Sequence, residues 1–153
     1  MNLMFRPIGI IHSPFKKKED IKKSRCIDPK GFANVQGKLE LYKEFEEGLQ
    51  DIDGFSHIIL IFAFHKSEES KLYAHPPFDD KRRGVFSTRS PNRPNPIGVT
   101  VLKLLGRQGN VLKVSGVDMI EGTPVLDIKP YTPREQKSDA RFGWLEQWIT
   151  EKN

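Results

Sequence analysis

A run of apolar residues at positions 57–64 constrains the fold of this chain more than any other segment. The run is rich in β-branched and aromatic side chains and is short for a helix, so it predicts a central strand, buried on both faces, that forms the core. Alternating apolar and polar residues at 35–41 predict a second, half-buried strand. Further strands are expected at residues 5–13, 98–105, 111–117 and 125–131.

Only the last part of the chain shows the spacing of a main helix. Asp139 is a suitable N-cap, and apolar residues recur at helical intervals from Phe142 to Ile149, which predicts a helix over residues 139–149. A shorter helix is expected near residues 44–49. About six or seven short strands with one such helix predict a mainly β fold: a small single-sheeted β-barrel with a C-terminal helix. No Gly-x-Gly-x-x-Gly follows a strand, so the fold is not expected to be Rossmann-like.

Two pairs of side chains are given structural interpretations. Trp144 and Trp148 lie four residues apart on a neighbouring stripe of the predicted helix, and we expect them to pack in the core or an interface. Asp127 and Lys129 share one face of the last strand. They are expected to form a structural ion pair, with an interior network that includes arginines as the alternative.

Composition limits the broad class of the protein. The 153 residues suggest a single domain, and a net charge of +5 with a pI near 9.3 is compatible with a polyanionic partner such as RNA. The single cysteine excludes an internal disulfide and fits a reducing cytoplasm. No apolar run approaches the roughly 20 residues that span a bilayer, and the N-terminus does not read as a signal peptide. We therefore expect a soluble cytoplasmic protein.

Common catalytic motifs are missing from the sequence. Gly31 and Gly37-Lys38 imitate a phosphate-binding loop, but the spacing is one residue too long and Leu39 replaces the required hydroxyl residue. The four histidines lack the close pairing of zinc ligands, so no metal site is expected. No Gly-x-Ser-x-Gly elbow supports hydrolase chemistry.

A proline-rich loop at residues 86–98 is the most informative polar segment. Pro91, Pro94 and Pro96 restrict the backbone. The loop also carries Arg89 and Arg93, and from Arg89 onward it has no large apolar side chain before residue 97. Guanidinium groups held on a stiff backbone suit recognition of a carboxylate or phosphate. The alternative is a rigid turn whose arginines lie in water.

Two other segments carry candidate functional groups. His65 and Lys66 end the buried strand, where a lone histidine is either functional or simply packed. Residues 118–124 form a loop in which Gly122 is free to adopt positive φ. Its backbone amides and Thr123 either form a plain turn or line a ligand such as adenosine.

The chain resembles the TrmO family, also called the TsaA-like or YaeB-like domain, from about residue 3 to about residue 145. The segments that carry the resemblance are Pro7-Ile8-Gly9-Ile10-Ile11-His12-Ser13-Pro14-Phe15-Lys16, Gly54-Phe55-Ser56-His57, Thr88-Arg89-Ser90-Pro91-Asn92-Arg93-Pro94-Asn95-Pro96-Ile97-Gly98 and Glu121-Gly122-Thr123-Pro124-Val125-Leu126-Asp127-Ile128-Lys129-Pro130-Tyr131.

The resemblance implies a methyltransferase that uses S-adenosylmethionine on tRNA. Its target would be N6 of threonylcarbamoyl-adenosine, next to the anticodon, and its fold a small β-barrel that works as a homodimer with cofactor sites near the interface. The positions that match cofactor contacts of the family are Asp28, His65, Lys66, Arg89, Ile120, Glu121, Gly122 and Thr123. Asp28 falls where the family often has Pro-Arg-Gln, so its role stays open. The chain also lacks an Asp-Pro-Arg-Pro motif, and we expect a compact, stand-alone form.

Basic residues form the expected tRNA footprint through phosphate neutralisation. They are Lys16, Lys17, Lys18, Lys22, Lys23, Lys81, Arg82, Arg83 and Arg93. No general base is assigned, although His65 and Asp118 are candidates. The alternatives are a non-catalytic module that binds a nucleotide or RNA, and a methyltransferase that acts on another adenosine or a small molecule.

Overall fold

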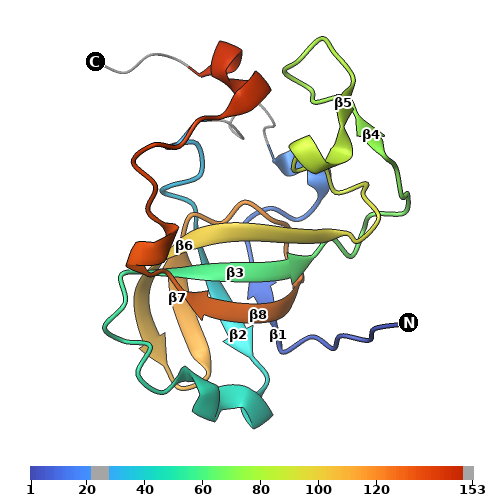
Figure 1. Cartoon of the computed structure of the whole chain (residues 1–153). Helices are drawn as coiled ribbons and strands as arrows, with labels where there is room; N and C mark the ends of the chain where they lie inside the picture. Colours follow the sequence, from blue (N-terminus) through green and yellow to red (C-terminus); the bar gives the residue numbers. More distant parts are fainter. Residues whose placement is uncertain (22–27, 150–153) are drawn as a thin grey trace.

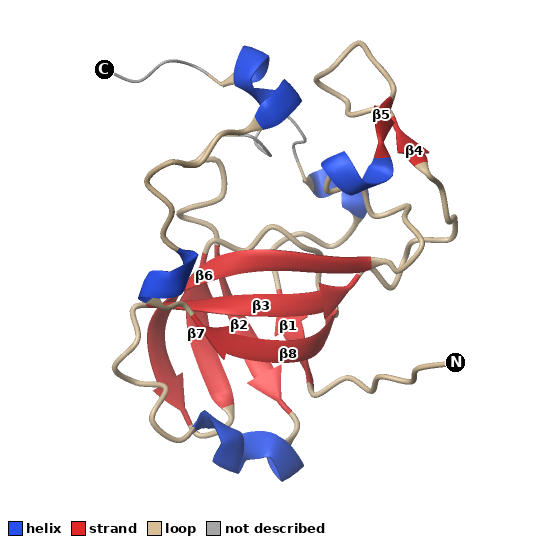
Figure 2. Cartoon of the chain, viewed as in Figure 1, coloured by secondary structure: helices blue, strands red, loops and turns tan. Residues whose placement is uncertain are grey.

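Six antiparallel strands close into a barrel in the computed structural model, which describes residues 1–21 and 28–149 (Figures 1 and 2). The strands are β1 (Gly9–His12), β2 (Gln36–Leu41), β3 (His57–Ala63), β6 (Ile97–Gln108), β7 (Val111–Ser115) and β8 (Pro124–Pro130). Their order around the barrel is β1-β2-β7-β6-β3-β8, and β8 pairs back with β1. The predicted small, mainly β barrel is confirmed.

The remaining regular elements are short. A two-stranded hairpin, β4 (Tyr73–Ala74) with β5 (Arg83–Gly84), lies in the long connection between β3 and β6. The described helices are all of the 3₁₀ type: η1 (Lys18–Asp20), η3 (Lys43–Leu49), η4 (Val85–Ser87), η5 (Pro133–Glu135) and η6 (Gly143–Trp148). We call residues 64–96, which include the hairpin and η4, the excursion.

The predicted C-terminal helix is wrong in its start and its type. Asp139 lies outside η6, and Phe142 takes the capping position. Gly143 has φ +52°, a left-handed conformation that an α-helix running from residue 139 could not contain. The packing role predicted for the two tryptophans is confirmed, because both rings contact Phe78 of the excursion: that of Trp144 is stacked and that of Trp148 is edge-on.

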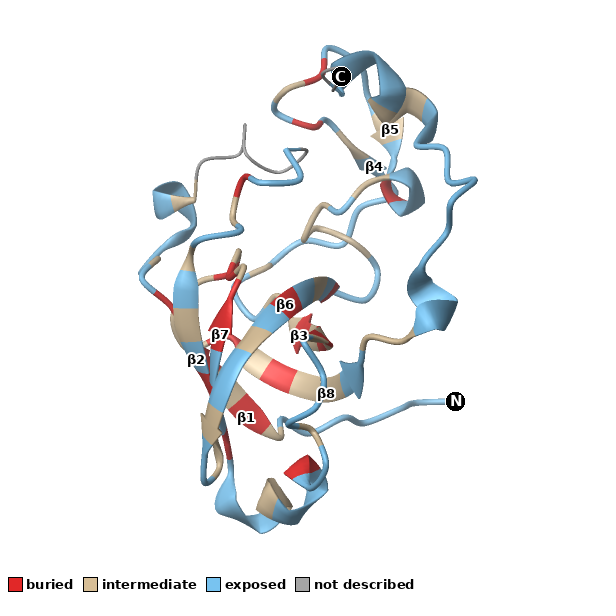
Figure 3. Ribbon diagram, turned by 90° about the vertical axis from the view of Figure 1, so that its left-hand side faces the viewer, coloured by how far each residue is buried: buried red, intermediate tan, exposed pale blue. Residues whose placement is uncertain are grey.

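The expectation that β3 is buried on both faces is also wrong. Its residues alternate between half-buried and buried, and the buried ones, Ile58, Leu60 and Phe62, belong to the core cluster. The ribbon in Figure 3 is coloured by burial and carries buried segments on the strands of the barrel. A closed barrel has one interior, so the other face of each strand points outward. On that outward side Ile59 pairs with Val101 and Ile61 with Val99, which leaves an apolar strip across β3 and β6.

Two connections cross the ends of the barrel because they join strands on opposite sides. Residues 42–56 run from β2 to β3 across one end and bury Leu49. Residues 116–123, which we call the crossing segment, run from β7 to β8 across the other end and bury Val117 and Met119. All three residues belong to the core cluster, so the barrel is plugged at both ends by its own chain.

Antiparallel order gathers every other candidate segment at the end closed by the crossing segment. The strands β1, β3 and β7 finish there, and β2, β6 and β8 start there. The connections at this end are therefore residues 13–35, the excursion and the crossing segment. We call it the site end.

Close packing at the site end requires a glycine at the start of β6. A β-carbon at Gly98 would overlap the ring of Phe62 and lie 2.8 Å from Cζ of Phe64. Those two rings pack edge to face, with centroids 5.1 Å apart. The glycine that follows the proline-rich loop thus lets two aromatic side chains lie directly against the backbone of β6.

Candidate functional site

The proline-rich loop is held in shape by polar contacts within itself and with the excursion. Nη1 of Arg93 donates to the carbonyl oxygens of Thr88 and Ser90, at 2.8 and 3.2 Å. The hydroxyl of Ser67 lies 3.0 Å from the carbonyl oxygen of Pro91. Arg93 was expected to contact tRNA, but its guanidinium is partly used to hold the loop, so its position is that of a supporting residue.

Arg89 has the opposite role in the same loop. Its side chain is exposed, and its Nη1 donates to the carbonyl oxygen of Val99 on β6 at 3.3 Å. Its positive charge also acts on Asp118 in the crossing segment. Within residues 1–21 and 28–149 the bond to Val99 is the one hydrogen bond of the Arg89 side chain, so most of its fork of donors is available to an anionic ligand.

The crossing segment is tied down through its backbone. The amides of Glu121 and Gly122 donate to the carbonyl oxygens of Phe15 and Ile11, at 2.7 and 2.8 Å. The hydroxyl of Thr123 donates to the carbonyl oxygen of Ile120 at 2.6 Å, and Thr123 is only 2% exposed. The amides of Glu121 and Gly122 and the hydroxyl of Thr123, which were expected to line a ligand, are thus engaged in hydrogen bonds within the protein. The half-buried side chains of Ile120 and Glu121 can still face a ligand.

A histidine between two carboxylates fixes Glu121. Nδ1 of His12 lies 2.9 Å from Oε2 of Glu121, and its Nε2 lies 2.8 Å from Oε1 of Glu40. The hydrogen bonds with Glu40 and then Glu121 raise the pKa of His12. Burial acts to raise the pKa of Glu121. The hydrogen bond from the amide of Ser13 and the interaction with His12 outweigh this effect, so that the pKa of Glu121 is lowered. The pattern of charges therefore favours an imidazolium clamped by two carboxylates.

Asp118 is a half-buried acid of the site end, and its set of hydrogen-bond partners among the described residues is incomplete. The hydroxyl of Thr100 on β6 donates to its Oδ2 at 3.2 Å, whereas its buried Oδ1 has no hydrogen-bond partner there. Burial raises the pKa of Asp118 to about 6, against the opposing effects of Thr100 and the charge of Arg89. Thr100 had not been singled out, although a polar residue at an inward position of an alternating strand is a usable signal.

The other residues expected to bind the cofactor also lie at the site end, but the described contacts do not join them in one hydrogen-bond network. His65 and Lys66 follow β3 and are exposed, and burial together with the charge of Lys66 lowers the pKa of His65. Asp28 is exposed, and its Oδ1 accepts from the amide of Lys30 at 2.9 Å in a turn. The recorded contacts bring Arg89, Asp118 and Thr100 together but do not link Asp28 to them.

The expected tRNA residues divide into exposed and engaged groups. Those exposed to solvent are Lys16, Lys17, Lys18, Lys81 and Arg82. Lys22 and Lys23 lie outside the described residues. Arg83 differs, because its Nε donates to Oδ2 of buried Asp79 at 2.6 Å and its guanidinium lies over the ring of Trp144. The structure therefore uses Arg83 to hold the excursion against η6 rather than presenting it to a ligand.

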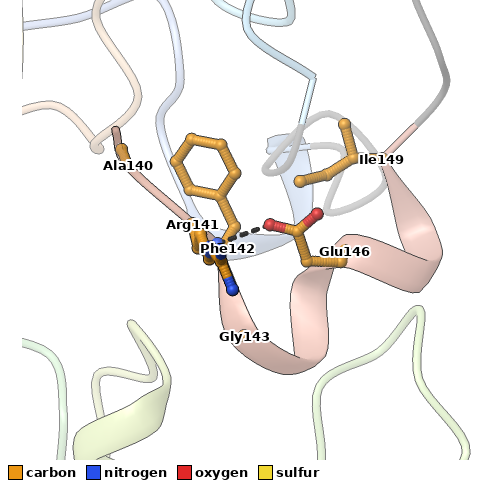
Figure 4. A pocket seen from close by; sticks show the side chains of 6 residues that line it. All are labelled: Ala140, Arg141, Phe142, Gly143, Glu146 and Ile149. Atoms are coloured by element: carbon orange, nitrogen blue, oxygen red, sulfur yellow. Dashed lines mark hydrogen bonds between the residues drawn. The ribbon is translucent and has the colours of Figure 1, made fainter. Parts of the chain in front are cut away.

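Two cavities lie away from these residues. One of about 600 Å³ is lined by η6 and the residues before it, where the amide of Phe142 donates to Oε2 of Glu146 (Figure 4). The other, of about 380 Å³, lies between η3 and β8 at the opposite end of the barrel. Neither is lined by Arg89 or Asp118.

Three further observations bear on the remaining expectations. Nζ of Lys129 lies 2.9 Å from Oδ2 of Asp127, which confirms the predicted ion pair. Within residues 1–21 and 28–149, no group of three or more His, Cys, Asp or Glu side chains is placed to hold a metal ion. No helix in that part of the chain has the length and apolar character needed to cross a bilayer.

Comparison with known proteins gives consistent matches. The family model of the tRNA-methyltransferase O N-terminal domain matches residues 10–137. A probable S-adenosyl-L-methionine-binding protein of Pyrococcus abyssi is 47% identical, over 95% of this chain and 77% of that protein. The human tRNA (adenine(37)-N6)-methyltransferase is 40% identical over 85% of this chain but only 30% of its own length.

Solved structures agree with the family match. A crystal structure of TrmO from Pseudomonas aeruginosa superposes with a TM-score of 0.74 at 38% identity, over 95% of this chain and 62% of that chain. The barrel predicted from the sequence is therefore a known architecture. The chain spans less than two thirds of that structure and about a third of the human protein.

The clamp around His12 should make stability depend on pH. A raised pKa means that His12 stabilises the fold fully below about pH 6.5 and less as pH rises through the folded value. The lowered pKa of Glu121 adds stability above about pH 4.5 that is lost as pH falls. His12→Ala should therefore lower the free energy of unfolding most between about pH 4.5 and 6.5, as measured by urea denaturation.

His75→Ala is the matched control, because His75 is exposed and forms no ion pair among the described residues. It should have little effect at any pH in this range. A loss of stability in His12→Ala that is as large at pH 9 as at pH 5.5 would contradict the charged clamp.

Proposed function

Because the chain belongs to the family of the tRNA-methyltransferase O N-terminal domain, we propose that it is a tRNA methyltransferase that uses S-adenosylmethionine. Its proposed target is N6 of threonylcarbamoyl-adenosine, the purine 3′ of the anticodon. The names of its relatives support both the donor and the tRNA substrate. The observation that carries the proposal is the convergence of an exposed guanidinium, a buried carboxylate and the crossing segment at one end of the barrel.

The residues at the site end fit such a donor chemically. S-adenosylmethionine supplies an electrophilic methyl group on a sulfonium, together with a carboxylate, an ammonium and an adenosine. Arg89 offers free donors for the carboxylate, and the half-buried Ile120 offers apolar surface for the base. His65, Lys66, Asp28 and Glu121 complete the proposed donor site. Gly122 and Thr123 support it by fixing the backbone of the crossing segment.

Positioning by the chain accelerates methyl transfer in the proposed reaction. An in-line displacement needs the attacking nitrogen and the methyl carbon at near-attack distance, and holding them there is worth several orders of magnitude. The stiff loop around Arg89 and the tied backbone of the crossing segment lose little entropy when they hold a ligand. No covalent intermediate with the protein is required.

The proposed tRNA surface consists of the exposed basic residues of the excursion and of the connection after β1. Lys81 and Arg82 are both exposed, and the guanidinium carbon of Arg82 is 4.0 Å from the ring centroid of the exposed Tyr73. Lys16, Lys17 and Lys18 lie on the other connection, at the same end of the barrel. Both groups can neutralise phosphates beside the donor site.

The direct test is incubation with S-adenosylmethionine and tRNA, with and without the threonylcarbamoyl group, followed by nucleoside mass spectrometry. We expect a methylated product only from modified tRNA. In the same assay, the double substitution Lys81→Glu with Arg82→Glu should raise KM for tRNA more than it lowers kcat, because phosphate contacts are lost.

Two outcomes would contradict the proposal. Donor binding without any methylated nucleoside would favour a non-catalytic module that binds a nucleotide or RNA. Equal methylation of unmodified tRNA, or of free adenosine, would point to a methyltransferase with a different substrate.

We also propose that the chain forms a homodimer through the outward face of β6. Ile97, Val99 and Val101 are 39%, 40% and 46% exposed along one side of this strand. The carbonyl oxygen of Val99 accepts the hydrogen bond from Arg89, so the apolar strip adjoins the proposed donor site. A second copy placed here would cover apolar surface and complete that site.

Sedimentation equilibrium tests this arrangement. The wild-type chain should be dimeric at micromolar concentration, and Val101→Lys should dissociate it and weaken donor binding, because a charge would be buried in the interface. Gln108→Lys places the same charge at the exposed far end of β6 and should leave the dimer intact. A monomeric wild type, or a dimer unaffected by Val101→Lys, would contradict this interface.

A further inference from the structure

Asp118 is a half-buried acid, and one of its carboxylate oxygens is buried without a hydrogen-bond partner among the described residues. It lies in the crossing segment between Val117 and Met119, which are both buried in the plug of the barrel. Thr100 donates to Oδ2, but Oδ1 is buried and has no partner among the described residues. Buried polar atoms are nearly always satisfied in native proteins, so an exception calls for a reason.

Asp79, a buried aspartate of the same chain, has the hydrogen bonds expected of a structural residue. Asp79 accepts from Arg83, from the amide of Asp80 and from Nε1 of Trp148, so both of its oxygens are satisfied. Its contact with Arg83 is also the main cause of its lowered pKa. Asp118 has a hydroxyl donor at 3.2 Å, an interaction with its own amide and no ion pair among the described residues. It is therefore built to accept something that the folded chain does not itself provide.

The groups around Asp118 belong to the site end. The charged group that acts on it is Arg89, which projects from the proline-rich loop. Thr100 lies on β6 beside Val99, whose carbonyl holds Arg89. Burial disfavours the charged form of Asp118 while Thr100 and Arg89 favour it, so the carboxyl group is poised to exchange a proton near neutral pH.

We propose that the carboxyl group of Asp118 accepts the proton that the substrate nitrogen loses during methyl transfer. This inference rests on the proposed function. The nitrogen forms a bond to the methyl carbon as the carbon–sulfur bond breaks, and that electron pair stays on sulfur. The N–H pair stays on nitrogen while the proton passes to Asp118, which later releases it to water. His65 is less suited, since it is exposed and lacks a comparable unfilled position.

The test uses the isosteric substitution Asp118→Asn and single-turnover methylation of threonylcarbamoylated tRNA across pH 5 to 9. We expect the rate to fall by about 100-fold, the lower range for a general base. Donor affinity, measured by calorimetry, should change little. The wild-type rate should decline at acid pH with an apparent pKa near 6, and this limb should be absent from Asp118→Asn.

A second variant tests the proton directly and does not depend on the stability of the first. Thr100→Val removes the hydrogen bond that lowers the pKa of Asp118, so the acid limb should move to higher pH. A purely structural Asp118 would not produce that movement. Asp53→Asn makes the same chemical change at an exposed site before β3, at the opposite end of the barrel, and should leave the rate unchanged.

The outcomes separate this inference from the proposed function. If the wild type methylates tRNA and Asp118→Asn does so equally fast, Asp118 is not the acceptor although the function stands. If Asp118→Asn loses donor binding but keeps its rate at saturating donor, Asp118 is a donor ligand and the inference is overturned. If the wild type forms no methylated nucleoside, the proposed function fails and the role of Asp118 fails with it.

Discussion

The path of the chain between β7 and β8 is the constraint on which the site depends. Two strands separate β7 from β8 on either side of the barrel, so the connection has to cross its end. Crossing the end buries Val117 and Met119 in the core and holds Asp118 between them. A functional segment thereby gains the rigidity of a core element, and hydrogen bonds to Ile11 and Phe15 fix it further.

The proline-rich loop reaches the same end with a different kind of rigidity. Its prolines restrict the backbone, and Arg93 satisfies two carbonyl oxygens that water would otherwise have to hydrate. Arg89 is then left as an exposed cation on a stiff support. The two arginines of one motif thus divide support and recognition between them, which the sequence pattern alone could not distinguish.

Much of the fold was predictable, because strand alternation depends only on local sequence. β2, β7 and β8 lie close to their expected ranges, and η3 covers the expected short helix. The C-terminal helix was not predictable, since the conformation of Gly143 and the contacts of Trp144 with the excursion are tertiary effects. β1 is shorter than expected and begins after Pro7, which has no amide hydrogen to donate.

The site was predictable only in part. Family resemblance pointed to Arg89 and the crossing segment, and these do lie at one end of the barrel. The pairing of His12 with Glu40 and Glu121 depends on strand register and on a contact between residues 109 positions apart in the chain. The buried Oδ1 of Asp118, which has no hydrogen-bond partner among the described residues, likewise could not be recognised from the sequence.

The proposed binding of S-adenosylmethionine at the site end is the step on which the function depends. A crystal structure of the chain with S-adenosylmethionine tests it most directly. We expect the methionine carboxylate against Arg89 and the adenosine beside the crossing segment. A donor bound instead between η3 and β8, or an Arg89 side chain that points into bulk solvent with the donor elsewhere, would contradict the account.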